Sequence, residues 1–506
     1  MISKKLISTA LLLVLPLTAP AGAVTPDQAK DALRKAVTFF HSHVAANGGY
    51  LWQYSGDLAL RQGEGKASET VVWVQPPGTP TVGEAFLDAY ESTGEQIHLS
   101  AAIDAAGALL LGQLHSGGWQ YHIEFDPAKR RDYSYRCDIN GKPQPDPTAP
   151  ADRAAPAGWY IWKKRKYKAN LTTLDDDTTQ AALRFLMRMD KALDFKDPRI
   201  HEAVQYGLAS LLNVQYANGA WSANFDRCQT APPDPKTYPI LKASCPAPWP
   251  PKWPKDFSGC YVTNDNLIAN MIKTMLCAWE VYNDQRCFDS ACKAGEFLIL
   301  AQMPDPQPGW AQQYDCNMHP VWDRAFEPPA ISAHESQTIL QALLMLYAGT
   351  GKKKYLDPIP RAVAYLRASQ LEPGRLARFY ELTTNRPLYF TRDKDGRHVM
   401  TYENKNLATN YAFIIDSVLD EIDAQYRRLI NAQWSPKPVQ VSDIEKVSPQ
   451  LAADAQAIIS AMDRRGAWVE RGVLAHHKLQ PESGVIDCAT FAKNIRTLCR
   501  FLNSNK

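Results

Sequence analysis

The sequence predicts an all-α fold, an α/α toroid (an incomplete α/α barrel) of helical hairpins with long loops on one rim. Three observations predict it: apolar residues recur at helical spacing, a short Gln–Gly–Trp motif repeats, and strand-like alternation is scarce. By length alone, 506 residues would suggest about three domains. Because the repeat continues along the chain, we instead expect a single toroid over residues 24–506.

Four segments carry the repeat clearly. They are "QLHSGGWQYHIE" from Gln113, "QYANGAWSANFD" from Gln215, "QMPDPQPGWAQQYD" from Gln302 and "QLEPGRLARFYE" from Gln370. Each has a Gln, a glycine-bearing turn, a Trp (Leu376 in the fourth) and an acidic residue five positions later; weaker echoes surround Trp52 and Trp468. We expect the tryptophans to wedge the turns against helix ends. We expect the acids to accept hydrogen bonds in loops: Glu124, Asp226, Asp315 and Glu381.

An apolar helical pattern precedes each clear copy. In "HEAVQYGLASLLNVQ", one face carries Val204, Leu208, Leu211 and Leu212. Further helical runs lie between the copies, including "DDDTTQAALRFLMRM" and "TNDNLIANMIKTMLCAWEVY". Each pair of runs predicts a hairpin that packs against its neighbours. Proline excludes helix from residues 142–158 and 228–260, which we expect to be surface loops. The basic run at 162–168 is either a solvated surface or the wall of a groove for a polyanion.

The first residues have the form of a secretory signal peptide over residues 1–23: two lysines, a short apolar run and Ala21-Gly22-Ala23. No later segment has the roughly 18 consecutive apolar residues of a membrane helix. We therefore expect a secreted or periplasmic monomer that does not contact the membrane after cleavage. Removing Lys4 and Lys5 lowers the formal charge from +3 to +1, which does not favour nucleic acid.

Ten cysteines in an exported chain predict disulfides. The partners nearest in sequence are Cys228/Cys245, Cys287/Cys292 and Cys488/Cys499.

The stretch "LDDDTT" places Asp175, Asp176 and Asp177 side by side at the beginning of a predicted helix. A helix N-terminus favours each acid by roughly 0.3–1 kcal/mol, which explains one or two of them but not three. A second helix begins alike, with Asp265 in "TNDN". If both beginnings lie on one rim, their carboxylates converge. Oxygen ligands with no His or Cys nearby suit calcium or magnesium better than zinc.

Arginines beside aromatic residues follow in "VWDRAFEPPAISAHES" and "RLARFYELTTNRPLYFTRD". A surface arginine is usually a solubilising or paired side chain. Several of them facing a carboxylate site predict a clamp for an anionic substrate.

These motifs, over roughly residues 160–415, resemble the pectate lyases of polysaccharide lyase family ten. The resemblance implies an α/α toroid that binds polygalacturonate with calcium (Ca2+) and cleaves it by β-elimination. It also implies site residues: Asp175 and Asp265 for calcium, Asp176 beside them for substrate, Arg324 as the base, and Arg378 and Arg392 for substrate carboxylates. The chain departs from the family where we expect Asn-Gly-Ala after Asp175 and find Asp176-Asp177-Thr178. The 228–260 insertion has no counterpart that we can place.

Arginine has a pKa of about 12.5 or more, so a basic Arg324 predicts an alkaline optimum. Otherwise His334 or Glu335 would take that role.

A glycoside hydrolase on the same ring could use Asp175 and Glu327 as its two carboxylates. A pectin-binding protein without activity is a further alternative. Gln-x3-Gly-x-Trp also occurs in triterpene cyclases, but Leu174 stands where their first acidic residue would be.

Overall fold

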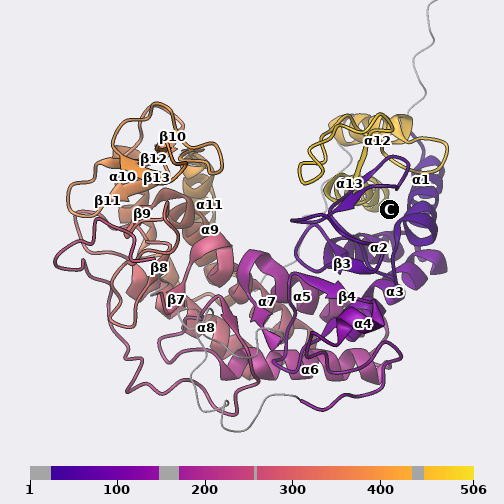
Figure 1. Cartoon of the computed structure of the whole chain (residues 1–506), viewed down its shortest axis with the longest axis horizontal. Coiled ribbons are helices and arrows are strands. Elements are labelled where there is room, and N and C mark those ends of the chain that lie inside the picture. Colours follow the sequence, from indigo (N-terminus) through magenta and orange to yellow (C-terminus); the bar gives the residue numbers. More distant parts are fainter. Residues whose placement is uncertain (1–23, 147–169, 256–258, 436–448, 506) are drawn as a thin grey trace, which may run out of the picture.

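The helices form an inner and an outer row that curve together into an open arc (Figure 1). This computed structural model describes residues 24–146, 170–255, 259–435 and 449–505. Along the arc, the inner row contains α13 (Cys488–Ser504), α2 (Thr79–Thr93), α5 (Thr178–Ala192), α7 (Leu267–Tyr282) and α9 (Ala333–Thr350). The outer row contains α1 (Pro26–Phe39), α3 (Gln96–Gly112), α6 (Pro198–Asn213), α8 (Gln285–Ala301) and α10 (Ile359–Ala368).

The two ends of the arc are formed by α12 (Pro449–Ala461) and α11 (Leu419–Asn431). Short helices occur at η1 (Phe40–Val44), α4 (Pro127–Arg130) and η7 (Lys353–Tyr355). The chain is therefore an incomplete α/α toroid, as predicted. The expected signal peptide, the basic run 162–168 and residues 147–158 and 256–258 of the proline-rich loops lie outside the described residues.

A short antiparallel strand pair frames each hairpin. One strand leads into the inner helix, and its partner follows the outer helix. The pairs are β3 (Val71–Trp73) with β4 (His122–Glu124), β5 (Thr172–Thr173) with β6 (Asn224–Phe225), β7 (Tyr261–Val262) with β8 (Gln313–Tyr314), and β9 (Ala330–Ser332) with β11 (Phe379–Glu381). The last pair extends through β12 (Pro387–Arg392) to β13 (His398–Thr401), while β10 (Arg375–Ala377) pairs with β14 (Ile414–Asp416). The strand pairs thus mark the rim at which the inner helices begin.

One unit of the ring is assembled from both ends of the chain. Strand β15 (Val485–Asp487) leads into α13 and pairs with β1 (Gln53–Ser55), which follows α1. Strand β2 (Arg61–Gln62) adds a third strand to this sheet. Helix α13 packs against both α1 and α2, so the C-terminal helix takes the place of an inner helix ahead of α2.

The repeated tryptophans and glutamines hold the turns in place. The indole nitrogens of Trp119, Trp221, Trp310 and Trp468 donate to main-chain oxygens near the ends of the helices that precede them at 2.7–2.9 Å. Gln113 Nε2 donates to Gly117 O of its own turn and to Ala203 O of the next outer helix, and Gln215 and Gln302 bond in the same way. The predicted wedges are confirmed. The Gln-x3-Gly-x-Trp motif therefore has a structural role and gives the cyclase alternative no support.

The acids of the repeat also behave as predicted, because they bond within the loops. Glu124 and Asp315 accept main-chain N–H groups, Glu381 accepts the hydroxyls of Thr384 and Tyr402, and Asp226 pairs with Arg227.

The prediction of disulfides is not supported, since all ten cysteines are described and none of them forms a disulfide. Cys488 and Cys499 lie on one helix eleven residues apart, which is about 16 Å along its axis. Cys287 and Cys292 also share one helix. A disulfide needs Cα atoms less than about 7 Å apart, so closeness in sequence was the wrong guide. Among the described residues, no helix has both the length and the apolar character to cross a bilayer.

Candidate cation and substrate site

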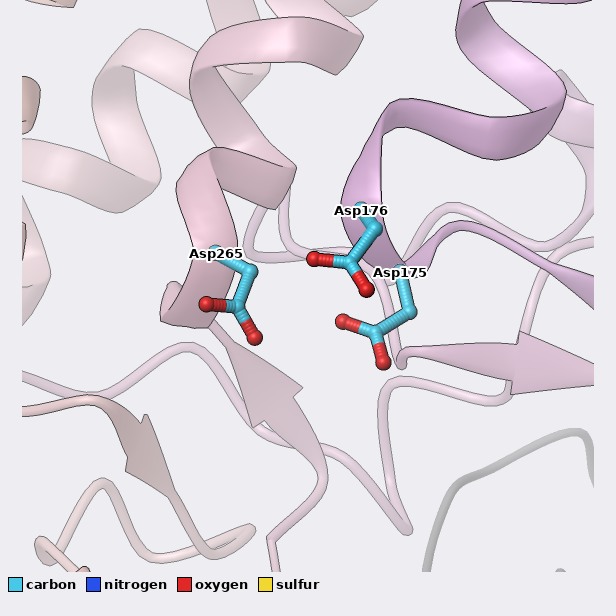
Figure 2. Close-up of side chains that lie close together, drawn as sticks. All are labelled: Asp175, Asp176 and Asp265. Atoms are coloured by element: carbon cyan, nitrogen blue, oxygen red, sulfur yellow. The ribbon is translucent and has the colours of Figure 1, made fainter. Parts of the chain in front are cut away.

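The beginnings of α5 and α7 bring three carboxylates together (Figure 2). A 3-10 turn precedes each helix: η5 (Asp175–Asp177) and η6 (Asn264–Asn266). One carboxylate oxygen from each of Asp175, Asp176 and Asp265 lies within 4.8 Å of the others. The predicted convergence of acids from two helices is confirmed, and all three acids share one place. The geometry therefore gives no reason to assign Asp176 to the substrate and the other two acids to calcium.

Two donors from the β3–β4 junction hold the acids of η5. The Tyr121 hydroxyl donates to Asp175 Oδ2 at 2.8 Å. The side-chain nitrogen of Gln75 donates to Asp176 Oδ2, also at 2.8 Å. Each contact engages one oxygen of its carboxylate. In Figure 2, one oxygen of Asp175 and one of Asp176 point toward Asp265.

The three acids carry more negative charge than their surroundings compensate. Burial, followed by the charge of Asp175, raises the pKa of Asp176 to about 7. Burial and the charges of Asp175 and Asp176 raise the pKa of Asp265 to about 8. Burial also raises the pKa of Asp175, although the Tyr121 hydrogen bond and the charge of Arg324 oppose it. A cation between these oxygens would relieve the repulsion. The donor set, three carboxylates without nitrogen or sulfur, fits calcium or magnesium.

The third acid of the triplet serves a different purpose. Asp177 Oδ2 pairs with Arg184 Nη2 at 2.5 Å, and Arg184 Nη1 donates to Thr274 of α7 at 2.9 Å. Arg184 is only 6% exposed. Asp177 makes no capping hydrogen bond with its side chain. Asp177 therefore pairs with the arginine that links α5 to α7, and it is not part of the acid cluster.

Arg324 lies in an ion pair with Glu327. Its Nε and Nη2 each donate to a Glu327 oxygen at 2.5 Å, and the Tyr411 hydroxyl donates to the same carboxylate at 2.9 Å. Burial alone would lower the pKa of Arg324, but the contact with Glu327 outweighs it and raises the pKa above its ordinary value. The side chain of Arg324 remains 45% exposed. Its charge lowers the pKa of both Asp175 and Asp176, so it lies within electrostatic range of the acid cluster.

The other two predicted arginines differ in exposure. Arg378 is buried, lies 3.5 Å from Glu335 and stacks over Tyr411 at 4.2 Å from the ring centroid. Arg392 is exposed at the end of β12, where it donates to Gly396 O at 2.6 Å and to the Asn410 side chain at 2.8 Å. Of the two, Arg392 is open to a ligand without rearrangement. Burial lowers the pKa of His334, one of the two alternative candidates for the base, which keeps that imidazole neutral.

The proline-rich insertion braces the loop that carries Arg324. Between β6 and β7, no described residue lies in a helix or strand, as predicted. The indole nitrogens of Trp249 and Trp253 donate to Pro329 O at 2.7 Å and Asp323 O at 2.9 Å. In return, Trp322 donates to Pro250 O at 2.8 Å. The insertion therefore fixes both ends of the segment from Asp323 to Pro329.

Sequence reasoning missed several residues of this site: Gln75, Tyr121, Gln312 and Tyr411. The repeat offered a sequence signal for two of them, Tyr121 and Gln312. Tyr121, Gln312 and Arg378 each stand two residues after the Trp (or Leu376) of their repeat, immediately before β4, β8 and β11. This repeat position faces the site in three units. Gln312 Nε2 donates to Asn264 at 2.9 Å and to the Tyr411 hydroxyl at 3.1 Å. Tyr411 follows no repeat and had no such signal.

Neither a protein-family model nor a curated protein sequence matches this chain. Solved structures match distantly. A mutant of a family 10 polysaccharide lyase from Cellvibrio cellulosa, in complex with trigalacturonic acid, is 18% identical, with a TM-score of 0.42 over 69% of this chain and 98% of that one. A D-mannose isomerase is 11% identical, with a TM-score of 0.44 over 96% and 100%. An α-1,6-mannanase variant from Salegentibacter sp. is 12% identical, with a TM-score of 0.39 over 94% and 98%. Scores this low do not identify a reaction or a substrate.

Proposed function

We propose that the protein is a polysaccharide lyase that cleaves polygalacturonate by calcium-assisted β-elimination. One observation carries the proposal: carboxylates from two helices, Asp175, Asp176 and Asp265, converge beside the partly exposed guanidinium of Arg324. The motif resemblance to pectate lyases of family ten adds to it. We also propose that the chain is exported, as its first 23 residues suggest; N-terminal sequencing of protein recovered outside the cytoplasm tests this.

Elimination removes the C5 proton of a uronate and expels the substituent on O4. The difficulty is the negative charge that builds up on the neighbouring carboxylate. Calcium, when bound, supplies positive charge at that carboxylate. Asp175, Asp176 and Asp265 would hold the ion. Arg392 would bind a uronate carboxylate. The buried Arg378 would hold the Tyr411 ring, over which it stacks, in position.

Arg324 is the proposed base, and its ion pair sets a condition on that role. Its pKa is raised by Glu327, so at neutral pH almost every molecule carries a protonated guanidinium. Proton abstraction then requires alkaline solution and release from Glu327. The proposal therefore includes a rate that increases with pH above neutrality.

Hydrolysis is the second candidate, and the raised pKa of Asp176 favours it. A carboxylic acid that keeps its proton near neutral pH, beside an ionised carboxylate, is the arrangement that glycoside hydrolases use. Asp175 would be its partner, although burial raises the pKa of that carboxyl as well. Glu327, the other carboxylate considered for this role, is held by Arg324 and Tyr411.

The deciding experiment measures ultraviolet absorbance of unsaturated uronate ends on polygalacturonate, with and without a calcium chelator. The proposal expects absorbance in the parent, its loss with chelator, and a decrease of about 10²–10³ in rate for Arg324→Ala. Saturated products would establish the hydrolase instead. Binding without cleavage would establish a pectin-binding protein. An Arg324→Ala variant at the parental rate would remove only the assignment of the base.

A further inference from the structure

The orientation of one buried amide beside the acid cluster is fixed by its neighbours. The indole nitrogen of Trp73 lies 3.1 Å from Gln75 Oε1. An indole N–H can only donate, so the atom that faces it must be the amide oxygen. The amide nitrogen of Gln75 must then face Asp176, whose Oδ2 accepts its hydrogen bond at 2.8 Å.

The main chain of Gln75 is held as firmly as its side chain. Trp52 Nε1 donates to Gln75 O at 3.0 Å, and the Gln75 N–H donates to Tyr121 O at 3.3 Å. Gln75 is only 4% exposed, so bulk water cannot replace these contacts. Tyr121, bonded to Gln75 through the main chain, donates its hydroxyl to Asp175. One junction of the sheet therefore presents two donors to two adjacent carboxylates.

A donor on one oxygen decides what the other oxygen can do. Asp176 Oδ2 is engaged by Gln75, and the carboxylate is thereby prevented from rotating. One oxygen of Asp176 points toward Asp265 and the other toward Asp175, so both lie among the acids of the cluster (Figure 2). A side chain that orients a metal ligand typically changes metal affinity 10–100-fold when it is removed.

We propose that Gln75, with its amide oriented by Trp73, is a positioning residue of the cation site and acts through Asp176. This inference rests on the proposed function, because it requires that the acids bind a cation. The competing explanation is structural: Gln75 would only satisfy the indole of Trp73 and contribute to stability. The two explanations differ in whether calcium affinity changes.

The test is calorimetric titration of the full chain with calcium. Gln75→Met keeps the length of the side chain and removes both amide atoms, and we expect its Kd to rise about 10–100-fold. Trp73→Phe leaves the amide free to turn, and we expect a smaller rise in Kd. The matched control is Gln215→Met. Gln215 is also buried, and it donates to Gly219 O and Ser290 O. Neither partner is an acid of the cluster. This control should lower Tm and leave Kd unchanged.

A second measurement separates action through Asp176 from a general disturbance. In an Asp176→Asn background, Gln75→Met should add little further loss of affinity, because the group that it orients is already altered. Full additivity of the two losses would overturn the inference, and so would a Gln75→Met variant that binds calcium like the parent. A parent that binds no calcium would overturn both the inference and the proposed cation site. These outcomes distinguish failure of the inference alone from failure of both.

Discussion

The beginnings of α5 and α7 share a backbone conformation but not their side chains. In each, a strand leads into a 3-10 turn with two consecutive left-handed residues: φ is +49° at Asp176 and Asp265, and +60° and +61° at Asp177 and Asn266. Asp and Asn adopt this conformation more readily than other non-glycine residues, because their short polar side chains bond locally. The residue types at these four positions are therefore explained without a ligand.

The charges are what this conformation does not explain. Asn could adopt the left-handed conformation at positions 176 and 265, as Asn266 does. Both positions nevertheless carry carboxylates. The first residue of each turn is not left-handed, and here Asp175 accepts from Tyr121 while Asn264 accepts from Gln312. Surplus negative charge thus gathers where the two turns meet. A cation site requires such charge, whereas a helix beginning does not.

Removing that surplus charge should have the largest effect. Asp265→Asn keeps the left-handed backbone and removes one carboxylate from the cluster. We expect calcium affinity to fall about 10²-fold or more and the rate on polygalacturonate to fall about 10²–10³-fold. Calorimetry and the absorbance assay measure these losses. A variant with parental calcium affinity would show that the acids do not act as one site.

The third position of the turn provides the matched contrast. Asp177→Asn also keeps the backbone, but it leaves the buried Arg184 without its carboxylate. We expect the free energy of unfolding to fall by about 1–3 kcal/mol, with unchanged calcium affinity. Urea denaturation and calorimetry test the two parts separately. A loss of calcium binding here would make the triplet a single functional unit.

The pH dependence sharpens the comparison further. The pKa values of Asp176 and Asp265, about 7 and 8, lie above the ordinary value of 3.8. The metal-free folded protein therefore binds more protons than the unfolded chain between roughly pH 4 and 8, and its stability falls as pH rises through that window. Calcium must displace the same protons, so its affinity should increase from pH 6 to 9. Asp265→Asn should flatten the dependence of Tm on pH in chelator; an unchanged slope would contradict these shifts.

The smallest effect concerns the backbone itself. The left-handed region costs Ala about 1–2 kcal/mol and costs Asn less. We therefore expect Asp176→Ala to be about 1 kcal/mol less stable than Asp176→Asn, with the same difference between the Ala and Asn variants of Asp265. Denaturant unfolding in chelator measures both differences. Unequal differences would mean that the two turns are not equivalent.

The toroid could be predicted because its turns repeat the same hydrogen bonds. In successive units, a Trp indole and a Gln amide donate to equivalent main-chain oxygens. The convergence of acids could be predicted because two inner helices begin alike. The prediction of disulfides is not supported, because export predicts oxidation but says nothing of the distances between cysteines. Burial of Arg378 beside Glu335 was also hidden, since a motif does not reveal which arginines reach solvent.

Gln75 and Tyr121 escaped prediction for a related reason. Their importance comes from the pairing of β3 with β4, two three-residue strands that lie 48 residues apart and show no clear alternation. Polar residues at the ends of such strands look like ordinary loop residues in one sequence. Only the contact with Asp175 and Asp176 sets them apart.

The unit built from β15–α13 and α1–β1 has a consequence for how the protein is made. During synthesis, α1 leaves the ribosome long before α13, which packs against it. Helices α2 and α3 also contact α1, but its contact with α13 can form only after nearly all of the described residues have been made. In the other units a short turn joins inner to outer helix, so a short peptide from residue 505 to residue 24 would recreate a normal hairpin. A circular permutant opened elsewhere on the ring should then fold without that delay.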